Sequence, residues 1–320
     1  MMLNKGKSFA ALLVSAAAFC TVVTVFPAAT PAQTLYAITE NSSYFGWLDQ
    51  YSLNTQKYNN VGSMACVPTA SVNAMTYLQN RSPGYFGTAL TGTSYASWTA
   101  ADVKLISPGY MDTSPANGTY YNHIPYALNK YISQDLGFSV RISGIMPQEY
   151  WRDAPYDNPG YISSGLPTSA FLLNSLSATQ ALLFSIMYDN GGGHQLLATG
   201  INWLDANDDG IIQETENATL SFVDPLDPSA TYPEGQPGGP VKLTTANIWN
   251  QYDQLTGMAL YLDYSQYGGA LPYNVGNYAQ TGPVMINTVF AVDTVPEPQT
   301  IVLFATGFSG LVLLRRKMQS

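Results

Sequence analysis

The chain has 320 residues, of which 46% are hydrophobic and 10% charged, and its formal net charge is −9. This length and hydrophobic content allow one domain with a substantial core. Residues 34–294 carry seven Lys or Arg against twenty Asp or Glu, a net charge of about −13. Because such an acidic surface repels nucleic acid and anionic lipid, we expect no nucleic acid among the partners.

Residues 1–32 have the three parts of a secretory signal peptide. Lys5 and Lys7 form the basic start, the run from Phe9 to Phe26 is apolar, and small residues follow it. We expect cleavage after Ala32, because small residues suit the positions next to the cleavage site. The sequence therefore predicts that the rest of the chain is exported.

The C-terminal segment, residues 294–320, combines the motif Val295–Pro298, a short apolar run and the basic cluster Arg315–Lys317. The apolar run is at the short limit for a transmembrane helix, and the basic cluster would stay in the cytoplasm. This order resembles the PEP-CTERM sorting signal of Gram-negative bacteria that make exopolysaccharide. The resemblance implies processing by an exosortase-type membrane protease and a final location in the cell envelope, at the cell surface or outside the cell.

Two further expectations come with this tail. The resemblance implies a short transmembrane segment before processing, and it makes the exopolysaccharide or biofilm matrix a candidate partner. An ordinary C-terminal membrane anchor is the alternative for residues 294–320.

Between the two signals, residues 33–293 are expected to form one domain with a single cysteine. Cys20 leaves with the signal peptide, so Cys66 has no partner for a disulfide within the domain. Residues 63–80 predict a helix that begins near Cys66, because Pro68 suits a first turn and apolar residues follow at helical spacing. A thiol at a helix N-terminus meets unpaired N–H groups and the positive end of the dipole, which favour the nucleophilic thiolate. A small buried core cysteine is the alternative.

After this helix, the pattern predicts helices first and strands later. Hydrophobic spacing indicates helices and strands in the following ranges: helices at 97–105, around 124–131 and at 168–178, and strands at 139–145, 181–188, 194–204 and 218–224. Successive strands with apolar runs indicate a mainly antiparallel sheet, and their separation from the helices indicates an α+β domain.

Three residues form a candidate catalytic group. Cys66 stands at a predicted helix start, His194 opens a predicted strand, and Asp224 ends the next strand. A cysteine nucleophile requires a base within hydrogen-bond reach and a third group that orients the base. His123 is the only competing histidine, but it falls in a predicted helix, where a satisfied structural histidine is expected. Asp227 lies beyond the strand and ranks second to Asp224.

The motifs around these residues resemble those of a known family. Cys66-Val67-Pro68-Thr69, Gly193-His194-Gln195 and Val223-Asp224-Pro225 are similar to motifs of papain-superfamily cysteine peptidases, in particular the branch with the bacteriocin leader-processing peptidases. The resemblance covers about residues 45–230. It implies an α+β, papain-like fold in which the helix that carries the nucleophile packs on a mainly antiparallel sheet.

The same resemblance implies a role for each residue. Cys66 would be the nucleophile, His194 the general base and acid, and Asp224 the residue that orients the imidazole, in a reaction on a peptide or protein substrate that passes through a thioester. A side-chain amide would complete the oxyanion hole. Gln56 is our first choice for it, with Gln50 and Asn60 as alternatives.

Val67 departs from this family pattern, because a glycine commonly follows the nucleophile there. The departure leaves a second reading open, a catalytically inactive papain-like protein that binds a partner at the surface or in the matrix. A transglutaminase-like or other amide hydrolase or transferase is a third reading, since transglutaminase-like enzymes also use Cys, His and Asp in this order.

Residues 205–216 fit the twelve-residue calcium loop of EF-hands. Gly210 stands where that loop turns sharply. The predicted ligands are four side chains and one carbonyl, those of Asp205, Asn207, Asp209, Glu216 and Ile211 respectively. The loop is an insertion between the strand of His194 and the strand of Asp224, so we expect a structural Ca²⁺ that stabilises this hairpin. A solvated acidic turn is the alternative.

Overall fold

The computed structural model describes most of the exported part of the chain: residues 33–53, 61–150, 161–188, 192–226, 241–253, 257–264 and 282–295. The expected signal peptide and transmembrane segment lie outside these residues, as do Gln56, Asn60 and Asp227. In the described part of the chain, no helix combines the length and the apolar character that crossing a membrane requires.

Five α-helices are described, and four of them come before most of the strands in the chain. Their bounds are Cys66–Arg81 (α1), Pro83–Phe86 (α2), Tyr95–Ile106 (α3), His123–Asn129 (α4) and Ser169–Ser177 (α5). A π-helical segment, Lys130–Asp135, continues α4 directly. The predicted helices near Cys66, at 97–105, around 124–131 and at 168–178 are thereby confirmed.

Helix α1 is buried along almost its whole length, from Val67 to Gln79. Its polar side chains therefore need partners inside the protein. Asn73 finds both of its partners on one residue, since it accepts from the Leu48 N–H at 2.8 Å and donates to the Leu48 carbonyl at 3.1 Å. This pair of bonds fastens the segment before Gln50 to the helix that begins with Cys66.

Nine strands form the sheet. Their bounds are Thr34–Thr39 (β1), Val140–Met146 (β2), Ile162–Ser164 (β3), Ala181–Met187 (β4), Gly193–Asp205 (β5), Thr219–Val223 (β6), Thr244–Asp253 (β7), Gly257–Leu262 (β8) and Val284–Thr294 (β9). The strands predicted at 139–145, 181–188, 194–204 and 218–224 are confirmed as β2, β4, β5 and β6. The sequence pattern had indicated no strand where β7, β8 and β9 lie.

These three additional strands change the fold class. Strands β4 to β9 pair in chain order, each antiparallel to the next, and β9 pairs back with β4, so that six strands close into a barrel. The predicted α+β, papain-like fold is therefore wrong. The expected arrangement was a helix on a sheet built from strands near His194 and Asp224. The late strand β9 instead lies between β4 and β8 and removes the open edge.

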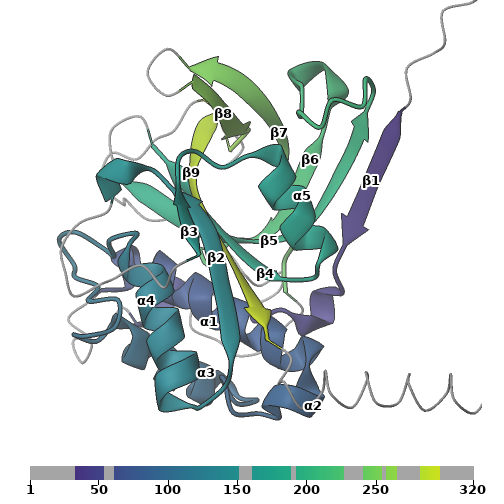
Figure 1. Cartoon of the computed structure of the whole chain (residues 1–320). Helices are drawn as coiled ribbons and strands as arrows, with labels where there is room; N and C mark the ends of the chain where they lie inside the picture. The colour runs from purple at the N-terminus through teal and green to yellow at the C-terminus, as the bar shows by residue number, and fades with distance from the viewer. Residues whose placement is uncertain are drawn as a thin grey trace, which may run out of the picture. The chain divides into compact units, whose positions relative to one another are not determined.

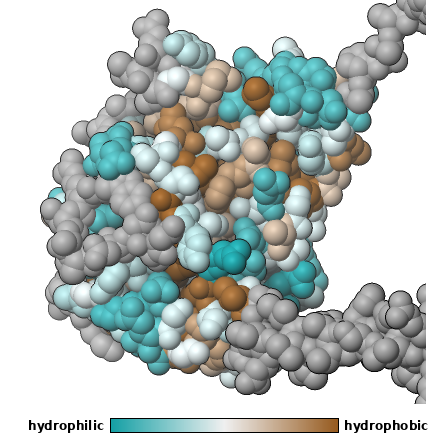
Figure 2. All heavy atoms as spheres, in the orientation of Figure 1, coloured by the Kyte–Doolittle hydropathy of each residue, from teal (hydrophilic) through white to brown (hydrophobic). Residues whose placement is uncertain are grey.

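The barrel encloses one hydrophobic cluster and carries another on its outer face. Phe184, Phe222 and Ile286 belong to the inner cluster, and leucines of α5 join it. Leu183 and Leu197 alternate with inner residues on β4 and β5 and pack with α1 in the outer cluster. Figure 1 shows α1 to α4 gathered on one side of the barrel. The space-filling view in the same orientation shows hydrophobic residues scattered among hydrophilic ones (Figure 2).

Candidate functional site

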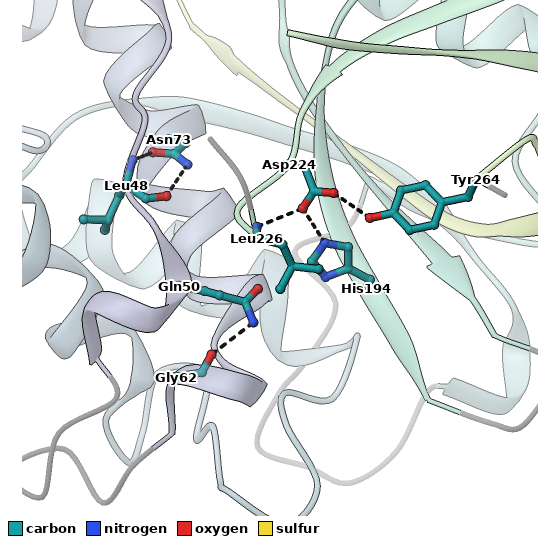
Figure 3. Close-up of polar contacts among 8 residues, drawn as sticks. All are labelled: Leu48, Gln50, Gly62, Asn73, His194, Asp224, Leu226 and Tyr264. Carbon is teal, nitrogen blue, oxygen red and sulfur yellow. Dashed lines mark hydrogen bonds and ion pairs between the residues drawn. The ribbon is translucent and has the colours of Figure 1, made fainter. Parts of the chain in front are cut away.

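The hairpin of β5 and β6 brings His194 and Asp224 together at one end of the barrel. The strands are antiparallel and Leu197 pairs with Val223, so the start of β5 adjoins the end of β6. His194 Nε2 lies 2.8 Å from Asp224 Oδ1, and both side chains are buried, with exposed fractions of 4% and 1% (Figure 3).

Asp224 has two further hydrogen-bond donors. The hydroxyl of Tyr264 donates to Oδ2 at 2.5 Å, and the Leu226 N–H donates to Oδ1 at 2.9 Å. Tyr264 comes from the segment directly after β8, on another part of the barrel wall. The carboxylate is thus fixed from several directions, and the imidazole that it holds is fixed with it.

Cys66 is the first residue of α1 and is partly exposed. It shares with His194 a pocket of about 110 Å³. The other lining residues are Gln50, Met64, Val67, Asn117, Gly118, Thr119, Tyr121, Tyr188, Gly192, Gly193, Gln195 and Leu226. The Cys66 side chain lies close enough to His194 to act on the titration of its imidazole. Because Asp224 occupies Nε2, Nδ1 is the ring nitrogen left for the sulfur.

The electrostatics favour a charged imidazole. Burial by itself lowers the pKa of His194, but the Asp224 carboxylate and the Cys66 side chain outweigh burial and raise this pKa to about 10. Burial likewise works to raise the pKa of Asp224, but His194, the Tyr264 hydroxyl and the Leu226 N–H outweigh it and hold the pKa below its ordinary value. Near neutral pH the pair is therefore imidazolium and carboxylate.

Of the three candidate oxyanion amides, Gln50 is the one within the described residues. It is 2% exposed and lines the pocket of Cys66 and His194. Its Nε2 donates to the Gly62 carbonyl at 3.1 Å, and its Oε1 has no hydrogen-bond partner among the described residues. The Gln50 N–H donates to the Pro225 carbonyl at 3.0 Å, which ties this residue to the chain beside Asp224.

The competing histidine, His123, lies elsewhere. It is buried, and its Nδ1–H donates to the Met111 carbonyl at 2.9 Å. It does not appear among the residues that line the pocket of Cys66.

Two tyrosines at the site had no counterpart in the sequence prediction. Tyr264 follows a strand that the sequence pattern did not indicate, and nothing in its neighbourhood marks it as a partner of Asp224. The only sequence feature related to Tyr121 is the glycine at position 193, the residue before His194, which the Tyr121 hydroxyl approaches closely. A Cβ atom on Gly193 would lie 2.3 Å from the Tyr121 hydroxyl oxygen and 2.8 Å from the Ile186 carbonyl oxygen, so a side chain there would displace its neighbours.

The predicted calcium loop lies at the other end of the hairpin. Asp205 is 1% exposed, and its two carboxylate oxygens accept from the N–H groups of Asp209 at 3.2 Å and Gly210 at 2.9 Å. Gly210 has φ 72°, as the predicted sharp turn requires.

Glu216 is held by other donors of the same region. It accepts from the N–H groups of Ala206 and Gln213, each at 2.9 Å, and from Trp203 Nε1 at 2.8 Å. Among the described residues, no group of three or more His, Cys, Asp or Glu side chains is arranged to hold a metal ion. As it stands, the loop is closed by its own N–H donors.

Residues 294–317 match the family model described as the PEP-CTERM protein-sorting motif. The tail is a PEP-CTERM sorting signal. This finding confirms the predicted signal: the protein is exported, is a substrate of an exosortase-type enzyme, and is located at the cell surface or outside the cell after processing. Comparison with curated proteins and with solved structures gives no match to the chain. Nothing in these comparisons supports membership of the papain superfamily, and the closed barrel contradicts the fold which that resemblance implied.

Proposed function

We propose that the protein is an exported cysteine peptidase that cleaves peptide bonds through Cys66, His194 and Asp224. One observation carries the proposal: a partly exposed thiol at a helix N-terminus shares a pocket with a buried, charged imidazole that a carboxylate holds at 2.8 Å. This is the combination of nucleophile, base and orienting group that acyl transfer requires. The proposal rests on the side chains alone and does not depend on a papain-like fold.

The reaction proceeds in two steps. The Cys66 thiolate attacks the carbonyl carbon of the substrate, the C–S bond forms, and the C–N bond breaks as His194 gives its proton to the leaving amine. Water then attacks the thioester, His194 takes a proton from the water, and the acid product leaves as the C–S bond breaks. Asp224 keeps the imidazole oriented and stabilises its charge in both steps.

The oxyanion that forms in each step needs donors at the edge of the pocket. The N–H groups of Cys66 and Val67, at the start of α1, have no partner within the helix. The Gln50 amide is the second donor in this proposal, because it is buried and lines the same pocket. Its Nε2 has a second hydrogen besides the one given to Gly62.

The partners follow from the location and the chemistry. At the cell surface, the substrate is a peptide or protein, and the exopolysaccharide or biofilm matrix is the setting in which the enzyme meets it. An inactive binding protein and an amide hydrolase or transferase of another kind remain the rivals. Val67 is the residue that suggested an inactive protein. It is buried and lines the pocket, and Cys66 stays partly exposed beside it.

Activity-based labelling tests this proposal. The purified protein without its sorting tail is treated with a peptide aldehyde or epoxide, alongside C66A and H123A. Wild type and H123A should react at Cys66 and cleave a peptide library, whereas C66A should do neither. A wild-type protein that fails to label would be the inactive binding protein. A protein that labels and hydrolyses simple amides but no peptide would belong to the other rival class.

We also propose that the loop 205–216 binds Ca²⁺ weakly in a structural role. Support comes from the donor set (Asp205, Asn207, Asp209, Glu216 and the Ile211 carbonyl) and from the glycine turn. Glu216 now accepts three bonds within the protein, so binding requires it to turn toward the other ligands. Calorimetric titration of the wild type and D205N with Ca²⁺ tests the site.

A further inference from the structure

A second pocket adjoins the pocket of Cys66 and His194. It has a volume of about 280 Å³, against about 110 Å³ for the first. Five residues line both: Asn117, Thr119, Tyr121, Gly192 and Gly193. The two pockets are therefore neighbours with a common wall, and a substrate held at Cys66 can extend into the second.

Tyr121 is the aromatic part of this wall, and it is held firmly. Its ring meets the ring of Tyr150 in a T-shaped contact with centroids 4.9 Å apart. Its hydroxyl packs against Gly193, where no Cβ atom would fit. Burial raises the pKa of Tyr121 well above its ordinary value, so the wall stays uncharged.

The other residues that line the second pocket are two aromatic side chains and a methionine. Tyr120, Tyr150 and Met187 line it, and the Tyr150 hydroxyl lies 3.7 Å from the sulfur of Met187. None of the described residues that line it is charged. Aromatic rings and a thioether bind another ring through edge and face contacts. A charged side chain would lose its hydration there without gaining a charged partner among the described lining residues.

One acidic residue near the second pocket bears on whether a charged substrate side chain could bind there. Glu149 is exposed on the chain next to Tyr150, and its negative charge acts on the Tyr150 hydroxyl. An acidic substrate side chain is therefore the least favoured. A basic one could reach Glu149 only by leaving the uncharged walls, since Glu149 is not among the lining residues.

We infer that the second pocket is the specificity subsite of the enzyme and selects substrates with an uncharged aromatic side chain next to the scissile bond. This inference rests on the proposed peptidase function and gives it a substrate class.

Three sets of substrates test the inference. Acylated tripeptide amides of aminomethylcoumarin are varied at one position at a time among Phe, Leu, Arg and Glu. At one position, kcat/KM for Phe should exceed that for Arg and Glu by about 10-fold or more, which is the scale of discrimination by a hydrophobic pocket. Y150A should remove most of this preference through KM. Y252A, an equal truncation at a residue that is 70% exposed on β7, should keep it.

A second readout separates the subsite from the chemistry. Iodoacetamide is too small to need the second pocket, so it should alkylate Cys66 at the same rate in wild type and Y150A. If cleavage requires Cys66 but Phe gives no advantage, or Arg is preferred, the subsite is wrong and the peptidase stands. If nothing is cleaved, binding of N-acetylphenylalaninamide decides: saturable binding that Y150A abolishes and Y252A keeps supports the pocket, and its absence overturns it.

Discussion

The two ends of the β5–β6 hairpin each hold a buried carboxylate, and they hold it differently. Asp224 is bonded to an imidazole from β5, a phenol from beyond β8 and one N–H of its own turn. Asp205 is bonded to two N–H groups four and five residues along its own loop. The first carboxylate depends on the closed barrel, and the second depends on a turn. The origin of the partners thus separates the carboxylate that would orient the proposed base from the carboxylate that closes a local turn.

The largest effect is expected from removing the imidazole at the site end. H194A should lower kcat/KM by 10³-fold or more, because the nucleophile and its base act as a unit. H123A is the matched control and should keep most of the activity, since its ring donates to the Met111 carbonyl and does not line the pocket of Cys66. Kinetics with a fluorogenic peptide measure both. Equal losses in the two variants would mean that the base is assigned wrongly.

The next effect separates the two carboxylates directly. D224N should lower kcat by about 10²–10⁴-fold, because an amide cannot stabilise the imidazolium and can favour the wrong tautomer. D205N should leave kcat unchanged and cost about 1–3 kcal/mol of stability, because its new NH₂ group would face a backbone N–H. Turnover and urea unfolding of both variants distinguish these outcomes. A loss of turnover in D205N would show that the two ends are coupled.

A smaller effect is expected at Tyr264, and pH reveals it. Without its hydroxyl, Y264F should have a higher pKa at Asp224 than wild type, though still a depressed one because His194 remains. A carboxylate with a depressed pKa contributes stability above its unfolded pKa and loses it as pH falls through the folded pKa. The acid limb of both stability and kcat/KM should therefore move to higher pH in Y264F. An unshifted limb would remove Tyr264 from the positioning network.

The smallest effect concerns Ca²⁺ at the loop end. With millimolar Ca²⁺ and a dissociation constant of about 10⁻⁴–10⁻³ M, binding should add only about 1 kcal/mol to the unfolding free energy. Turnover should hardly change, because the loop and the Cys66 pocket lie at opposite ends of the hairpin. Melting curves with chelator and with Ca²⁺ give the first quantity and kcat the second. Identical melting curves would reduce the loop to a hydrogen-bonded acidic turn.

Features that depend on neighbouring residues could be predicted from the sequence. The helix that begins at Cys66, the strands β4 to β6 and the turn at Gly210 follow from local spacing and residue type, as does the sorting motif. Adjacent strands joined by one loop pair readily, so the proximity of His194 and Asp224 could be predicted as well.

Features that depend on distant pairing could not. The pattern of residues within β9 does not predict which strands it pairs with. Its pairing with both β4 and β8 is what closes the barrel. Tyr264 was missed for the same reason. Gln50 was ranked below Gln56 on spacing alone. It reaches the pocket because the Asn73 side chain binds the backbone of Leu48 and holds this segment on α1. The local sequence around Gln50 contains no pattern that predicts such a contact with a distant helix.

The order of the site residues along the chain has a consequence for biosynthesis. A polypeptide is made from its N-terminus, so the thiol of Cys66 emerges first, the imidazole and the carboxylate follow, and the phenol of Tyr264 comes almost last. The barrel cannot close until β9 is complete, and β9 ends where the sorting motif begins. A partly made chain therefore carries an unsupported thiol and no assembled triad. On the proposed function, catalysis therefore begins only with the finished fold.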